Sequence, residues 1–167
     1  MPDLIPWFLY LHVLGAIIAF GPTFIFPLIG GMGGAEPMHG NFATRVSHAI
    51  SARRVIPVAL TMPVTGIGLI WSVGLDPFSR AERWLAAGIV LYVIALTYSL
   101  AVQTPAVNRI IAMTAGPPPG APPGPPPSGP PPGLMEIVGK VQRGGMLLSG
   151  LIVVIVLLMV VKPDLGF

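Results

Sequence analysis

The chain has 167 residues, of which 53% are hydrophobic and only 9% are charged. A soluble domain carries about 25% charged residues, so the composition excludes an ordinary soluble protein and indicates one that contacts the lipid bilayer. Cysteine is absent, which excludes disulfides and thiolate metal sites. The net charge is +3, and the basic residues lie at the ends of apolar segments. This position favours anionic lipid and not nucleic acid as a partner.

The first predicted transmembrane helix covers residues 4–29, LIPWFLYLHVLGAIIAFGPTFIFPLI, which contain no Asp, Glu, Lys or Arg. As a helix this segment would be roughly 39 Å long, more than the ~30 Å hydrocarbon core of a bilayer. Pro22 and Pro27 lack an amide hydrogen, so they should bend its second half. Gly15 and Ala19 belong to a stripe of small residues, which we attribute to ordinary packing against a neighbouring helix.

The next segments predict a loop, a surface helix and a second span. Residues 30–40, GGMGGAEPMHG, predict a flexible loop because they are rich in glycine. Residues 41–54 predict a short amphipathic helix at the membrane interface, since their apolar side chains recur at steps of three and four. Residues 55–73 are uncharged and predict the second span, with kinks expected at Pro57 and Pro63.

The second half of the chain predicts two further spans on either side of a low-complexity linker. Residues 84–103 and 144–161 are the predicted third and fourth spans. Residues 116–133, GPPPGAPPGPPPSGPPPG, form an uncharged linker rich in proline and glycine. Together these segments predict an all-α polytopic membrane protein, a single membrane domain over residues 1–167 with four transmembrane helices in an antiparallel bundle.

The distribution of lysine and arginine predicts the orientation of the bundle. Of the nine such residues, the first and third connections hold Arg45, Arg53, Arg54, Arg109, Lys140 and Arg143, and the other side holds Arg80, Arg83 and Lys162. Because basic residues gather in cytoplasmic connections, we expect both termini outside. The expected location is the bacterial cytoplasmic (inner) membrane.

His12 is the candidate functional residue, because an ionisable side chain well inside a span indicates a functional site. It could be an axial ligand of haem, a hydrogen-bond partner of a quinone, a proton carrier, or a neutral histidine bonded to a facing hydroxyl or carbonyl group. Met62 lies roughly 16 Å deep in the second span, within one helical turn of the level of His12. The spacing therefore permits a His/Met cofactor-binding pair, with Thr61 and Thr65 as hydrogen-bonding groups beside it, although a methionine in such a position more often fills space in the core.

Motifs of enzymes are absent from the sequence. Every carboxylate lies outside the apolar cores or at their borders, and there is no H-E-x-x-H motif, no G-x-S-x-G motif and no His/Asp/Glu cluster. We therefore expect no catalytic residue and no metal-ion site, and the pattern does not favour an enzyme.

Two stretches carry a family resemblance. LHVLGAIIAFGPTFIFPL (residues 11–28) and LLMVVKP (residues 157–163) resemble a bacterial family of small predicted integral membrane proteins, the domain of unknown function 2269. The resemblance covers nearly the whole chain and implies the architecture but no activity. His12 is also distantly similar to the first-helix histidine of the copper-resistance D-type and haem-binding protoporphyrinogen oxidase membrane families. In the oxidase family that histidine is implicated in haem binding, but the expected intramembrane lysine has no counterpart here, because Lys162 is at the far interface.

These patterns lead to two hypotheses of function. The first is a small-ligand or cofactor-binding, redox-associated membrane protein that binds haem b or a quinone at His12, with Met62 as a second contact. The alternative is a non-catalytic accessory or structural subunit of a larger membrane complex, without its own cofactor. Other membrane subunits or further copies of the chain are the expected protein partners.

Overall fold

The computed structural model describes residues 4–116 and 129–165. The described residues are almost entirely helical and form four helical rods, Ile5–Ala35, Pro37–Val73, Arg80–Met113 and Leu134–Val161, each long and apolar enough to cross a membrane. This confirms the prediction of an all-α membrane protein with four transmembrane helices. Most of the predicted linker, residues 116–133, lies outside the described residues.

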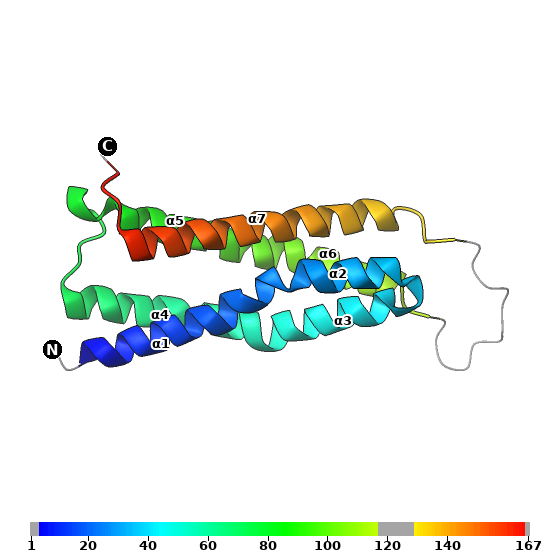
Figure 1. Cartoon of the computed structure of the whole chain (residues 1–167), viewed down its shortest axis with the longest axis horizontal. Helices are drawn as coiled ribbons and strands as arrows, with labels where there is room; N and C mark the ends of the chain where they lie inside the picture. Colours follow the sequence, from blue (N-terminus) through cyan, green and yellow to red (C-terminus); the bar gives the residue numbers. More distant parts are fainter. Residues whose placement is uncertain (1–3, 117–128, 166–167) are drawn as a thin grey trace.

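Three of the rods contain more than one helical segment. In chain order the elements are α1 (Ile5–Phe20), η2 (Gly21–Phe24), α2 (Phe26–Ala35), η3 (Pro37–His39), α3 (Gly40–Ile50), η4 (Ser51–Val55), α4 (Ile56–Val73), η5 (Arg80–Glu82), α5 (Arg83–Tyr98), η6 (Ser99–Gln103), α6 (Thr104–Met113) and α7 (Leu134–Val161). The first rod changes from α-helix to a 3₁₀ turn at Pro22, where a bend was expected, and Figure 1 shows α2 displaced from the line of α1.

The prolines of the second and third rods follow π turns. η4 ends two residues before Pro57, and η6 ends two residues before Pro105. A proline ring collides with the carbonyl four residues earlier and donates no hydrogen bond to it. The wider π turn moves that carbonyl away, so both rods continue through their prolines. α4 also continues through Pro63.

The prediction of a flexible loop at residues 30–40 is wrong. Helix α2 continues to Ala35, and only the short turn around η3 separates it from α3. The glycines instead allow two helices to approach closely. A Cβ atom at Gly33 would lie 2.8 Å from the Cβ of Ala43 and 3.4 Å from the Cα of Gly40. Any side chain at Gly33 would therefore push α2 and α3 apart.

The amphipathic segment predicted at residues 41–54 is helical, but it is not a separate helix. α3 passes through η4 into α4 without a break, so the second rod has 37 residues and would be roughly 55 Å long. That length exceeds the ~30 Å hydrocarbon core. The segment therefore extends the second span, and its location at the membrane interface stays a prediction.

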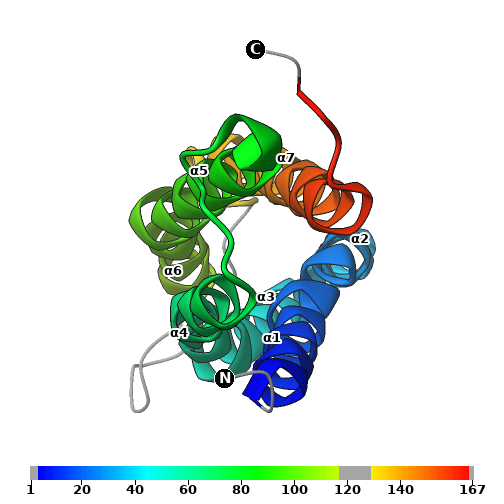
Figure 2. The ribbon, with the colours of Figure 1, turned by 90° about the vertical axis from the view of Figure 1, so that its left-hand side faces the viewer.

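The helices form a ring when the bundle is viewed end-on (Figure 2). At the end where α1 begins and α7 ends, α1 packs on α4 and α5 packs on α7. At the opposite end α3 packs on α2 and α6, and α7 packs on α6 and α2. The Tyr92 hydroxyl on α5 donates a hydrogen bond to the carbonyl of Ala59 on α4, which connects the two pairs.

The bundle buries few large side chains. One small cluster of buried residues, Trp84, Leu85 and Leu158, lies where α5 meets α7. On the outside Trp71 is 74% exposed and Val160 is 75% exposed. Soluble proteins rarely leave large apolar patches uncovered, so these outward faces fit contact with the acyl chains of a bilayer.

Candidate functional site

His12 lies on α1 where this helix packs against α4. Its Nδ1 atom is 2.9 Å from the hydroxyl oxygen of Thr65. That hydroxyl donates its own hydrogen to the carbonyl oxygen of Met62 at 3.0 Å. Since a hydroxyl has one hydrogen to donate, Thr65 accepts from His12, and the network assigns the hydrogen of a neutral His12 to Nδ1.

The second ring nitrogen of His12, Nε2, is left with a lone pair. It has no hydrogen-bond partner in the part of the chain that the structure describes, and every buried polar side-chain atom in that part has one. Nε2 is therefore accessible at the surface of the half-buried ring. Histidines that bind a metal commonly use one ring nitrogen while the other donates to a fixed acceptor. His12 has this arrangement, and Nε2 is equally able to accept a hydrogen bond from a hydroxyl group.

Glycines on both helices make room for the candidate side chains. A Cβ atom at Gly66 would lie 3.5 Å from the Cε1 atom of His12, and one at Gly15 would lie 2.7 Å from the sulfur of Met62. Met62 is 5% exposed. The structure thus brings His12 and Met62 to one helix contact, with the Met62 sulfur against the backbone of α1.

The two threonines named with this pair differ in position. Thr65 contacts His12, whereas Thr61 is exposed and donates to the carbonyl of Val58 at 2.7 Å. Sequence reasoning missed Gly66, which faces the His12 ring. Its residue type is the signal that could have identified it, because glycine lets membrane helices approach closely.

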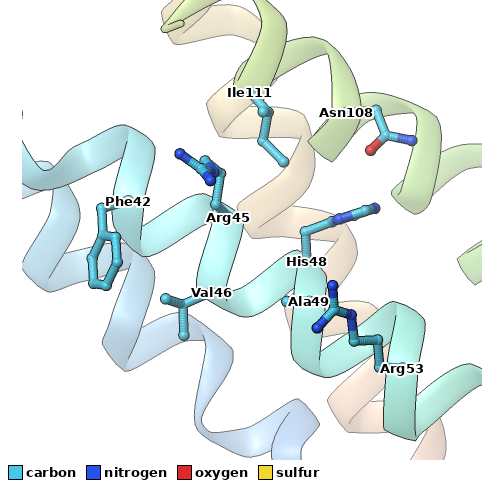
Figure 3. Close-up of a pocket in the computed structure, with 8 residues that line it drawn as sticks. All are labelled: Phe42, Arg45, Val46, His48, Ala49, Arg53, Asn108 and Ile111. Atoms are coloured by element: carbon cyan, nitrogen blue, oxygen red, sulfur yellow. The ribbon is translucent and has the colours of Figure 1, made fainter.

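A second polar region lies between the second and third rods, and sequence reasoning did not find it. It is a pocket of about 440 Å³ between α3 and α6 (Figure 3). Arg45, His48 and Arg53 come from α3 and η4, and Asn108 comes from α6. The His48 ring extends toward the side on which Asn108 lies, and the Arg53 guanidinium turns back along its helix (Figure 3).

Apolar side chains complete the lining of this pocket. Phe42, Val46 and Ala49 lie on α3 and Ile111 lies on α6. The pocket therefore has cationic and apolar groups on the same helix. In the sequence these residues were recognised as faces of an amphipathic helix, but the partner helix that closes the pocket could not be inferred from periodicity.

Other polar side chains connect helices. Gln103 donates from Nε2 to the carbonyl of Val141 on α7 at 2.9 Å. Asn41 donates to the carbonyl of Ile111 and to the hydroxyl of Thr114, at 3.1 and 2.8 Å. In the described ranges, no group of three or more His, Cys, Asp or Glu side chains is placed to hold a metal ion.

Comparison with known proteins gives one match. Residues 7–163 match the family model described as predicted integral membrane protein (DUF2269). No curated protein and no solved structure matches the chain.

Proposed function

The chain belongs to the predicted integral membrane protein family of domain of unknown function 2269, and we propose that it binds a small ligand or cofactor, haem b or a quinone, at His12. The observation that supports this is the hydrogen bond from His12 Nδ1 to Thr65, 2.9 Å long. It holds the ring in one tautomer and leaves the Nε2 lone pair accessible. A packing histidine would make the same bond to Thr65, so the accessible Nε2 is the feature that favours a bound ligand.

The residues around His12 fit either group. His12 Nε2 would hold haem through its iron, or would accept a hydrogen bond from the hydroxyl of a quinol. Met62 is the proposed second contact from α4, since its flexible thioether can change rotamer away from Gly15. When bound, either group supplies electron transfer, while the chain orients the group through Thr65 and His12.

The proposed setting is the bacterial inner membrane, with both termini outside. α1 begins and α7 ends at the same end of the bundle (Figure 1), while α3 and α6, which carry Arg45 and Arg109, lie toward the opposite end. The positive-inside rule supports a cytoplasmic location for that basic end. A reporter enzyme that works only in the periplasm should be active when it is fused to the C-terminus. Strong activity of a reporter that works only in the cytoplasm, fused at the same place, would contradict this orientation.

The first test is an absorption spectrum of the full chain purified in mild detergent, before and after reduction with dithionite. We expect a Soret band that shifts on reduction and disappears in His12→Ala but remains in His48→Ala, the matched control. Solvent extraction of the same samples should be analysed for quinone. A folded sample with neither haem nor quinone, or with the same content in His12→Ala, would contradict the proposal.

Two further variants test the geometry. Thr65→Val removes the acceptor for Nδ1 and should weaken binding about 10- to 100-fold, as is usual when the partner of a ligating histidine is lost. Met62→Leu keeps the volume but removes the sulfur, so an altered haem spectrum supports Met62 as a ligand. An unchanged spectrum would remove Met62 from the site and leave His12 as the contact.

A second candidate function is an accessory subunit of a larger membrane complex, without a cofactor. The exposed apolar faces favour it, for example Val64, Ile67 and Trp71 at helical spacing on α4, which are 68%, 65% and 74% exposed. Crosslinking in native membranes followed by copurification tests this function. A stable partner with no pigment or quinone would favour the accessory subunit over the ligand-binding protein.

A further inference from the structure

The pocket between α3 and α6 holds cations that the protein does not neutralise. Within the described residues neither Arg45 nor Arg53 pairs with a carboxylate, whereas Lys140 pairs with Glu136 at 2.9 Å. Both arginines are exposed, and Asn108 adds an amide from the facing helix. Arginine presents a planar set of donors that suits phosphate oxygens, so this lining favours a phosphate group.

The apolar part of the same pocket points to an amphiphilic ligand. Phe42, Val46 and Ile111 line it beside the arginines. A soluble phosphate compound has no apolar part that could contact these side chains, whereas the first segments of an acyl chain can pack against them. The volume of about 440 Å³ is toward the small end of the roughly 300–1,000 Å³ range of ligand pockets. This volume suits a lipid headgroup whose acyl chains extend out of the pocket along the helices.

The position along the helix agrees with a lipid headgroup. Arg53 and Arg54 are followed by the uncharged run 55–73, which would be about 28 Å long as a helix and so cross the hydrocarbon core. Arg53 is therefore near the level at which lipid phosphates lie. Basic pockets between membrane helices at this level are typical sites for anionic lipid headgroups.

We propose that the pocket formed by Arg45, His48, Arg53 and Asn108 binds the phosphate headgroup of an anionic phospholipid. Arg45 and Arg53 are eight residues apart on one helix, roughly 12 Å along it. One guanidinium group therefore contacts the phosphate and the other the polar part of the headgroup beyond it, while the apolar residues contact the glycerol and upper acyl chain. The site lies between α3 and α6, away from the contact of α1 with α4 that holds His12, so it does not depend on the proposed function.

The test measures binding of phosphatidylglycerol to the full chain in mild detergent by native mass spectrometry. The pocket variant is Arg45→Gln/Arg53→Gln. The matched control is Arg54→Gln/Arg80→Gln, which removes the same charge from residues outside the pocket. We expect the dissociation constant to rise about 30-fold in the pocket variant, as follows from losing two exposed ion pairs with the bound headgroup. The control should change it by less than about threefold.

Further arms identify the ligand. The variant Arg45→Lys/Arg53→Lys keeps both charges and should bind phosphatidylglycerol more tightly than the glutamine variant, close to the unchanged protein. Circular dichroism checks that all variants stay folded. Equal weakening in the pocket variant and the control would overturn the proposal, because it would show general surface attraction. Glycerol 3-phosphate should bind far more weakly than phosphatidylglycerol. Equal affinity of the two would assign the pocket to a soluble phosphate compound and refute the lipid.

Discussion

Two glycines on α4, two residues apart, should respond in opposite ways to the same substitution. At Gly68 an added Cβ atom would lie 2.5, 2.6 and 2.9 Å from three ring atoms of Phe8 on α1. At Gly66 the nearest atom, Cε1 of His12, would be 3.5 Å away, which is an ordinary contact distance. Gly68→Ala should therefore destabilise the bundle, whereas Gly66→Ala should leave it unchanged or more stable.

The magnitude follows from comparing the two variants. Replacing glycine by alanine inside a helix favours the helix by about 1 kcal/mol, and this contribution is common to Gly66→Ala and Gly68→Ala. The difference between them is then the cost of overpacking, typically about 1–3 kcal/mol. Gly68→Ala should accordingly be less stable than Gly66→Ala by that amount, because the Phe8 ring must move away from α4.

Unfolding of the full chain in detergent by a denaturing surfactant provides the assay. Trp84 is buried between α5 and α7, so its fluorescence should change when the bundle unfolds. In a Phe8→Ala background Gly68→Ala should lose its penalty and match Gly66→Ala. If the two glycine variants are equally stable with Phe8 present, the close packing of α1 on α4 described here is incorrect.

Two other predictions concern hydrogen bonds between helices. Tyr92→Phe removes the bond to the carbonyl of Ala59 and should lower the free energy of unfolding by about 0.5–1.5 kcal/mol, measured by surfactant unfolding. An unchanged stability would mean that this bond does not hold α4 to α5. Asn41→Ala removes the bonds to Ile111 and Thr114, so it should increase hydrogen exchange at the end of α6. Unaltered exchange there, as measured by mass spectrometry, would contradict the anchoring of α6 by α3.

The sequence was sufficient to predict the four spans. Residues 4–29, 55–73, 84–103 and 144–161 each have the length and apolar character that a bilayer requires. Apart from Leu4, each segment falls inside one of the helical rods of the structure. The bilayer imposes this pattern on every span, so it can be recognised without knowledge of the neighbours. The bend at Pro22 was predictable for the same reason, since proline acts on its own helix.

Features that depend on a second helix were not predictable. Residues 30–35 were assigned to a loop because glycine favours loops in general, but Gly33 packs against Gly40 and Ala43. The continuity of α3 with α4 depends on the π turn η4, for which the sequence has no distinct pattern. The pocket around Arg53 needed α6 beside α3, which periodicity along one helix cannot reveal.

The candidate site was partly predictable because small residues line the contact of α1 with α4. Lipid is as apolar as a leucine side chain, so helix association in membranes depends on close packing and hydrogen bonds. The contact of α1 with α4 accordingly buries Gly15, Ala19 and Gly68, while Trp71 faces outward. Small residues mark the interior at this contact, although Met62 is buried there too, and elsewhere Trp84, Leu85 and Leu158 are buried. The sequence alone did not show whether His12 faces the bundle or the lipid, because that depends on where the neighbouring helix lies. In the structure His12 contacts Thr65 of α4, on the side of α1 where Gly15 is also buried.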